Sequence, residues 1–137
     1  MAVASSPPLR WAVLHVDFDP VVGHEQGGGR RALVVSYEPF HRSGRVTVCP
    51  ITAARAAVRY ANEVPIPVGE AGQTRPGVIQ CHQVRTVSIE RASRGTIPAY
   101  PSYVTDMSIR RLVRRALQRQ LGLDVPELLD LAGAYTS

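Results

Sequence analysis

Apolar and polar residues alternate along much of the chain, and this period of two predicts β-strands. Between Arg10 and Asp19 every second side chain is apolar, so this segment is predicted to form a strand with one buried face, made of Ala12, Leu14, Val16 and Phe18. Further apolar stretches, bounded by glycine, proline or polar residues, predict more strands. They span Arg31–Tyr37, Arg45–Ile51, Tyr60–Val68, Val78–Val87 (one or two strands) and Thr96–Tyr100.

Prolines and glycines set the expected positions of edges and loops. Pro50 has no N–H for a strand ladder, so Arg45–Ile51 is predicted to lie at a sheet edge or to carry a bulge. Tyr60–Val68 contains prolines as well and is predicted to be an edge strand. Three consecutive glycines make Gly23–Gly29 a predicted loop. Short turns or helical turns are predicted at Glu38–Arg42, Thr52–Val58 and Ser88–Arg94.

Near the C-terminus the pattern changes to a helical period. From Met107 onward, apolar residues recur at spacings of three and four, which places them on one face of an amphipathic helix. Thr105 is the predicted N-cap, with Asp106 in the first turn, and Gly122 is the predicted end. A second short helix is predicted at Val125–Ala132. The rest of the long helix carries arginines that we interpret as a solvated face, with phosphate contact as the alternative: Arg110, Arg111, Arg114, Arg115 and Arg119.

Many short strands followed by one long helix predict an α+β domain built on a small, bent antiparallel β-barrel. The length of 137 residues suits one domain, and no internal repeat or linker divides it. Residues 1–9 are predicted to be a disordered tail and residues 10–137 a single domain. No stretch approaches the ~18 apolar residues of a membrane span. The first residues also do not resemble a secretory signal.

The charge of the chain favours a nucleic-acid partner. The formal net charge is +5, and every basic position other than histidine is arginine. Arginine binds phosphate bidentately and stacks on bases. A GC-rich codon bias accounts for the absence of lysine but not for the excess of base over acid.

The cysteines and histidines predict no metal site. Cys49 and Cys81 lie in apolar stretches, which predicts free, buried thiols in a cytoplasmic protein. Two isolated cysteines and four scattered histidines show no spacing typical of metal ligands. We therefore expect neither a metal nor another cofactor.

The most specific pattern in the chain is VDFDPVVGHEQGGGRRALVVS at residues 16–36. A strand and a D-x-x-P turn precede G-x-E-Q-G-G-x-R, and an apolar strand ending in serine follows. This order resembles the MazF/PemK family of messenger-RNA interferases. Two later segments agree with the family in order and spacing: VCPIT at 48–52 and QVRT at 83–86. The likeness covers residues 10 to 123, including the C-terminal helix.

The chain departs from the family pattern at two places. Arg31 stands where the family usually has proline, which would stiffen the loop. The first strand of the family usually begins R-G-[DE], whereas this chain has Arg10, Trp11 and Ala12. The resemblance implies the CcdB/PemK-like toxin fold. It also implies a toxin of a type II toxin–antitoxin system that cuts single-stranded messenger RNA at short sequences without a metal.

The resemblance assigns catalysis to Arg30 and Thr52. A metal-free ribonuclease can use the 2′-hydroxyl of RNA as nucleophile and then needs donors that stabilise the charged phosphorane. Because the pKa of arginine exceeds ~12, we interpret Arg30 as a phosphate clamp and transition-state stabiliser, although the family assigns the matching arginine an acid or base role. Thr52 would donate its hydroxyl to the scissile phosphate; its alternative role is a helix cap. The implied products are a 2′,3′-cyclic phosphate and a 5′-hydroxyl.

Substrate binding is predicted around the same motifs. Glu25 would order the loop by pairing with an arginine, and Gln26 would read a base edge. Arg85 would hold a phosphate, or be a charge on the strand surface. His24 and His82 titrate near neutrality but are interpreted as loop and solvent-facing residues. The predicted binding set is Glu25, Gln26, Gly28, Arg31, Gln83 and Arg85.

The resemblance also implies partners. A groove made of Arg30, Arg31 and Arg85, with Arg45 and Arg55 as further members, would bind single-stranded RNA or the flexible acidic segment of a MazE-like antitoxin. A homodimer is implied as well, and no membrane partner is expected. Two alternatives stay open: a CcdB-like toxin that acts on DNA gyrase by protein contact, and a plain nucleic-acid-binding module. Arg30 with Thr52 favours the nuclease, and an aromatic content of 6% argues against a stacking module.

Overall fold

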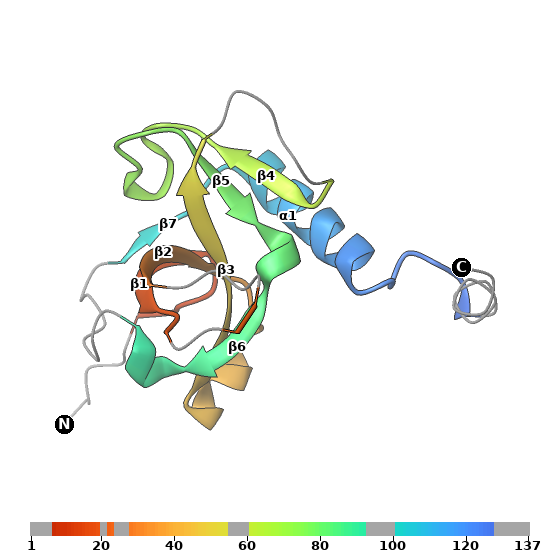
Figure 1. The fold of residues 1–137 in the computed structure, drawn as a ribbon, viewed down its shortest axis with the longest axis horizontal. Coiled ribbons are helices and arrows are strands. Elements are labelled where there is room, and N and C mark those ends of the chain that lie inside the picture. Colours follow the sequence, from red (N-terminus) through yellow and green to blue (C-terminus); the bar gives the residue numbers. More distant parts are fainter. Residues whose placement is uncertain (1–6, 20–21, 24–27, 55–60, 93–100, 128–137) are drawn as a thin grey trace.

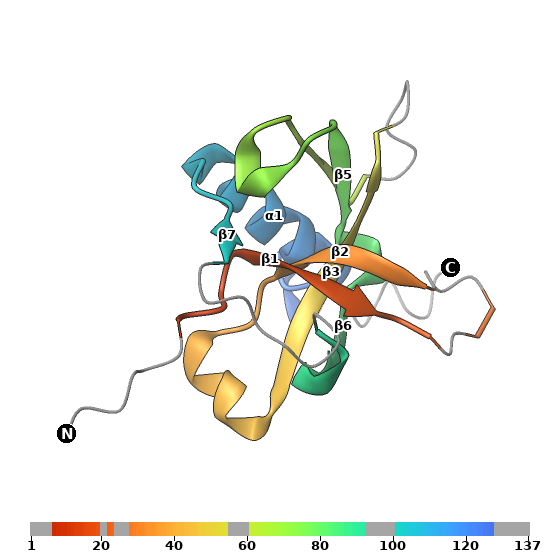
Figure 2. The ribbon, with the colours of Figure 1, turned by 90° about the vertical axis from the view of Figure 1, so that its left-hand side faces the viewer.

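The computed structural model describes residues 7–19, 22–23, 28–54, 61–92 and 101–127. Its strands form one curled antiparallel sheet in the order β4-β5-β3-β2-β1-β7, and β6 pairs separately with β3 (Figures 1 and 2). The strands are β1 (Ala12–Asp17), β2 (Gly29–Val34), β3 (Arg45–Ala53), β4 (Glu63–Ile66), β5 (Gly77–Gln80), β6 (Arg85–Ser88) and β7 (Ser102–Tyr103). Four short 3-10 helices are described: η1 (Glu38–Ser43), η2 (Glu70–Gly72), η3 (Cys81–Gln83) and η4 (Ile89–Arg91). The α-helix α1 spans Met107–Gln120.

The long strand β3 lies at the centre of the sheet, so the edge position predicted from Pro50 is wrong. One edge of β3 pairs with β2, where Pro50 lies opposite Ala32. The other edge pairs first with β6, up to Val48, and then with β5, from Ile51 onward. Pro50 lies between these two ladders, where neither requires its missing N–H. The central strand can therefore contain a proline and pass from one ladder to the next.

Apolar clusters cover both faces of the curled sheet. The side chains predicted to form the buried face of β1, among them Leu14 and Val16, pack with Phe18 against Val34 and Val48. The opposite face buries Leu33, Cys49 and Ile51 beneath Ile109, Val113 and Ala116 of α1. Figure 2 shows α1 against one side of the sheet, while β1 and β2 extend beyond it as a hairpin. The predicted fold class, a bent antiparallel half-barrel with a C-terminal helix, is confirmed.

Helix α1 is amphipathic as predicted, but it begins one residue later than the sequence indicated. Asp106 is the N-cap, and its Oδ1 accepts a hydrogen bond from the backbone N–H of Ser108 at 2.8 Å. The hydroxyl of Thr105 donates instead to Glu70 Oε1 at 3.0 Å. Both residue types cap helices well, and the contact with η2 decides which of them does so. Gly122 follows the helix with φ 68°, in agreement with the predicted end.

Most other predicted elements are found with shifted ends. Tyr60–Val68 contains the edge strand β4, and Val78–Val87 contains β5 and β6 separated by η3. Glu38–Arg42 lies in η1. The helical turn predicted from Thr52 is wrong at its start, because Thr52 and Ala53 pair with β5 in strand β3. Residues 55–60 and 93–100 and most of the helix predicted at 125–132 lie outside the described residues.

Glu38 fastens the start of the chain to the sheet. Its Oε1 accepts hydrogen bonds from the backbone N–H groups of Leu9 and Arg10, at 2.9 and 2.8 Å. Its Oε2 lies 3.3 Å from Nδ1 of His41, whose Nε2 is hydrogen-bonded to the hydroxyl of Ser36 at 2.6 Å. The network therefore links the segment before β1 to η1 and to the end of β2.

We expect Glu38→Gln to lower the free energy of unfolding at neutral pH by about 1 kcal/mol, the order of one partly exposed charge-assisted hydrogen-bond network. Burial raises the pKa of the Glu38 carboxyl, but the N–H groups of Arg10 and Leu9 and the contact with His41 outweigh it and hold the pKa below its ordinary value. A carboxyl whose pKa is lowered on folding stabilises the protein above its unfolded pKa of about 4.3, and the effect is lost as pH falls through the folded value.

Urea unfolding at several pH values measures this effect. The difference in unfolding free energy between the wild type and the Gln variant should be largest near neutral pH and should vanish in acid. Equal stabilities at neutral pH would show that the network does not stabilise the fold.

Cys49 and Cys81 are free and fully buried, as predicted. A hydrogen bond with Cys81, together with burial, raises the pKa of the Cys49 thiol well above its ordinary value. Among the described residues, no helix has the length and apolar character that a membrane crossing requires.

Candidate active site

Arg30 and Thr52 belong to neighbouring strands and share one face of the sheet. Strands β2 and β3 pair as far as Ala32, which lies opposite Pro50. Residues two apart on a strand point to the same side, so Arg30 faces the same side as Ala32, and Thr52 the same side as Pro50. Both side chains are half-buried. Two motifs that are separate in the sequence thus contribute to one face of the sheet.

Arg85 faces the same side of the sheet. It pairs with Val48 of β3, which shares the face of Thr52 because the two are four residues apart. The guanidinium carbon of Arg85 lies 5.3 Å from the centroid of the Phe18 ring, and its Nη1 lies 3.5 Å from the Phe18 carbonyl oxygen as a hydrogen-bond donor. Phe18 is fully buried and gives the cation a rigid support. Arg85, predicted to hold a phosphate or to be a strand-surface charge, is therefore oriented toward the end of β1.

Hydrogen bonds close the base of the loop that joins β1 to β2. The N–H of Phe18 donates to the carbonyl of Gly28 at 3.0 Å, and the N–H of Gly28 donates to Asp19 Oδ1 at 2.9 Å. Gly28 has φ 74°, a conformation that favours glycine. Of the predicted binding residues, Gly28 thus closes the base of this loop. Glu25, Gln26 and His24, by contrast, lie outside the described residues.

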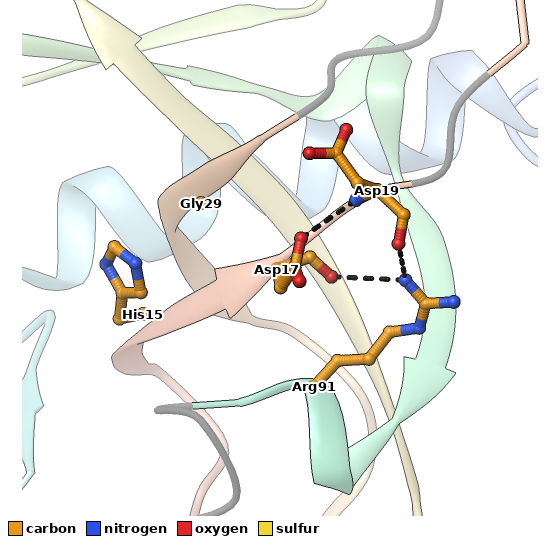
Figure 3. A pocket seen from close by; sticks show the side chains of 5 residues that line it. All are labelled: His15, Asp17, Asp19, Gly29 and Arg91. Carbon is orange, nitrogen blue, oxygen red and sulfur yellow. Dashed lines mark hydrogen bonds between the residues drawn. The ribbon is translucent and has the colours of Figure 1, made fainter.

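A second arginine, Arg91 of η4, holds the same loop base. Its Nη1 donates to the backbone carbonyl of Asp17 at 3.4 Å and to that of Asp19 (Figure 3). Because Arg85 reaches the carbonyl of Phe18, arginines bind three successive carbonyl groups where β1 ends. The loop that carries the family motif therefore starts from a fixed anchor.

Arg91 was not among the predicted site residues. It lies in no motif, and a bridge between Val16 and Ala92, far apart in the sequence, brings it to β1. With His15, Asp17, Asp19 and Gly29 it lines a pocket of about 280 Å³ (Figure 3). Only its basic character hinted at a role, and that character is shared by every arginine in the chain.

The remaining predicted residues are placed apart from this face. Arg31 is adjacent to Arg30 in β2 and so points to the opposite side, where it pairs with His15. Gln83 and His82 lie half-buried in η3, which connects β5 to β6. Arg45 lies at the exposed start of β3, and Arg55 is outside the described residues.

The shared face suits a phosphate group that gains negative charge. Arg30 and Arg85 supply guanidinium donors, and Thr52 supplies a hydroxyl. Donors oriented in advance stabilise a developing oxyanion without reorganisation during the reaction. In the described ranges, His, Cys, Asp and Glu side chains form no group of three or more that could hold a metal ion.

Comparison with known proteins shows the family of the chain. The sequence pattern of the PemK-like, MazF-like toxins of type II toxin–antitoxin systems matches residues 9–120. The chain belongs to this family. The match includes Arg30, Thr52 and Arg85, together with the strands that carry them.

Individual relatives of this MazF-like chain include enzymes and solved toxin structures. It is 36% identical to the endoribonuclease toxin ChpB of Escherichia coli K12 over 105 residues, which cover 75% of this chain and 89% of ChpB. It is 36% identical to the endoribonuclease EndoA of Bacillus subtilis over 83 residues, or 60% of this chain and 72% of EndoA. The crystal structure of MazF from Deinococcus radiodurans aligns with a TM-score of 0.67 at 27% identity, covering 84% of this chain and 96% of that chain.

Proposed function

We propose that this MazF-like toxin is an endoribonuclease that cuts single-stranded messenger RNA at short sequences and needs no metal. The observation that carries the proposal is that Arg30 and Thr52 lie on the same face of the neighbouring strands β2 and β3. Arg85, which is held against Phe18 on the same face, supports it. The names of the relatives ChpB and EndoA, both endoribonucleases, point to the same class of reaction.

In the proposed reaction the 2′-hydroxyl oxygen of the RNA forms a bond to the adjacent phosphorus, and the bond from phosphorus to the 5′ oxygen breaks. The 2′-hydroxyl loses a proton and the leaving 5′ oxygen gains one, so the products are a 2′,3′-cyclic phosphate and a 5′-hydroxyl. Arg30 and Thr52 stabilise the charged phosphorane between these steps. Arg30 acts as a charge donor, because a guanidinium with a pKa above ~12 rarely releases its proton.

Several of the remaining predicted residues are proposed to bind the nucleotides on either side of the cut. Arg85 holds a phosphate next to the scissile one. Glu25 would order the loop and Gln26 would read a base edge. Gly28 completes this set at the base of the loop, whereas Arg31 and Gln83 lie apart from this face and are left out of it.

Incubation of the pure protein with a long single-stranded RNA in EDTA tests the reaction. We expect cleavage at a limited set of sites, with 2′,3′-cyclic phosphate and 5′-hydroxyl ends identified by end-labelling. Single-stranded DNA of the same sequence should stay intact. Intact RNA, combined with inhibition of DNA gyrase, would replace the proposal by the CcdB-like alternative.

An antitoxin and a second copy of the chain are the proposed partners. The crystal structure of the MazE–MazF complex from Deinococcus radiodurans aligns with a TM-score of 0.62 at 26% identity, over 88% of this chain and 99% of that chain. We propose that an acidic, flexible antitoxin segment occupies the basic face and excludes RNA. If RNA and the antitoxin segment bound the toxin at the same time with full affinity, this competition would be disproved.

We also propose that the toxin is cytoplasmic and forms a homodimer. Light scattering at micromolar concentration measures the mass of the particle in solution. A mass that corresponds to the monomer alone would contradict the homodimer.

A further inference from the structure

A second group of arginines lies where the start of α1 meets the start of β1. A pocket of about 250 Å³ is lined there by Arg10, Trp11, Met107, Arg110, Arg111 and Arg114. Four of these six residues are arginine, and none is acidic. Trp11 precedes β1, whereas Arg30 pairs with Val16 toward the other end of that strand. The arginine pocket therefore shares no lining residue with the candidate active site and lies at the opposite end of β1.

Two of the arginines are stacked on the single tryptophan. The guanidinium carbons of Arg10 and Arg110 lie 5.5 and 5.2 Å from the centroid of the Trp11 ring. Arg110 is fixed further, because its Nε donates to the Val104 carbonyl at 2.7 Å. A guanidinium held over an aromatic ring keeps N–H groups for the bidentate contacts that phosphate accepts.

The backbone of Trp11 is strained, which marks the position as unusual. Its φ is 69°, in the left-handed region that bulky residues rarely adopt. Glycine would adopt this conformation freely, whereas the Cβ of tryptophan makes it costly. The strained residue is held by two backbone hydrogen bonds of 2.8 Å, from its N–H to Val34 and from the N–H of Val104 to its carbonyl. Such outliers cluster at ligand sites because the surroundings must fix them.

The pocket carries an excess of positive charge. Its lining holds four arginines and no acidic side chain. Asp106, whose carboxylate caps α1 through Ser108, interacts electrostatically with Arg111 and offsets part of this charge. Within the part of the chain that the structure describes, Arg10 Nε is buried without a hydrogen-bond partner. Like charges crowded into one hollow predict a bound anion.

We propose that the arginine pocket binds phosphate groups of single-stranded RNA at a distance from the cleaved bond. The choice of RNA as the polyanion rests on the proposed function. The site would hold a longer transcript, whereas a substrate limited to the nucleotides around the cut would not reach it.

Fluorescence of Trp11, the only tryptophan, reports directly on this pocket. The probe is a 2′-O-methyl RNA of about twenty nucleotides, which binds like RNA but has no 2′-hydroxyl nucleophile. We expect the probe to change the fluorescence. The double variant Arg111→Ala/Arg114→Ala should weaken its binding about tenfold. Because each lost contact to a single strand lowers the salt slope by about 0.7, the double variant should lose about 1.4.

The control variant is Arg42→Ala/Arg115→Ala, which removes the same charge from exposed positions outside the pocket. All four arginines of these variants are exposed, so both proteins should fold. The control should bind the probe with nearly wild-type affinity and slope. If both double variants bound the probe equally weakly, the loss of affinity would reflect the net charge of the protein, and the proposed site would be refuted. If Arg111→Ala/Arg114→Ala bound the RNA probe normally but bound an acidic peptide more weakly than the wild type, the pocket would serve a protein partner. That result would also refute the proposed RNA site.

Cleavage assays separate failure of this site from failure of the proposed function. With a long RNA as substrate, Arg111→Ala/Arg114→Ala should have a KM about tenfold higher than the wild type and an unchanged kcat. With a five-nucleotide substrate, KM and kcat of this variant should both match the wild type. A protein that cuts no RNA, but loses probe binding in the pocket variant, would refute the ribonuclease and keep the site. Normal cleavage with unchanged probe binding would refute the site alone.

Discussion

Arg30→Ala and Thr52→Ala are each expected to slow RNA cleavage by roughly 10²-fold or more, the usual loss when one transition-state donor is removed. Both side chains lie half-buried at the rim of the sheet face and outside the apolar clusters. Folding should therefore be retained, as thermal melting and circular dichroism can verify. Single-turnover cleavage at saturating protein isolates the chemical step from binding.

Conservative variants define what each side chain contributes. Thr52→Ser keeps a hydroxyl and should recover most of the rate lost in Thr52→Ala. Arg30→Lys keeps the charge but not the planar fork, so it should fall between the wild type and Arg30→Ala. Arg42→Ala, an exposed arginine of η1, is the matched control. Rates near wild type for both alanine variants would show that the site is assigned to the wrong residues.

A single 2′-deoxy nucleotide on the 5′ side of the scissile phosphate is expected to abolish cleavage of that bond. The substitution removes the proposed nucleophile and leaves the phosphate that Arg30 and Thr52 are proposed to bind. Affinity should change little, because the charge recognised by the arginines is unaltered. The measurement compares cleavage of two oligonucleotides that differ only in the position of the deoxy nucleotide.

The matched substrate carries the 2′-deoxy group one nucleotide away from the cut and should be cleaved normally. Cleavage of the substrate that lacks the 2′-hydroxyl at the cut would mean that another nucleophile, such as water, attacks the phosphorus. That result would disprove the mechanism without changing the family to which the chain belongs.

The structure connects these expectations to the loop that carries the family motif. Arg85 and Arg91 bind the backbone carbonyls at the end of β1, and Gly28 closes the other side of the loop base. Neither Arg85 nor Arg91 needs to contact substrate to affect the rate. Because geometric precision limits catalysis, loosening this anchor should reduce cleavage through the position of the loop.

Several features of this protein follow from its sequence alone, because they depend on local order. The alternation from Arg10 to Asp19 is sufficient for a strand whose even-numbered side chains are buried, and spacings of three and four from Met107 are sufficient for α1. The spacing of the motifs around Arg30, Thr52 and Arg85 identified the family. These patterns record the period of a single element, which covalent geometry determines without knowledge of its neighbours.

Only the tertiary structure decided how these elements combine. The change of partners along β3 allows Pro50 in a central strand, and the contact of Thr105 with Glu70 leaves Asp106 to cap the helix. The sheet register sets Arg30 and Arg31 on opposite faces, and a distant bridge delivers Arg91 to the loop base. The stacking of Arg10 and Arg110 on Trp11 likewise joins residues a hundred positions apart. Contacts of this kind depend on how strands pair and where the helix docks, and no local period in the chain records either.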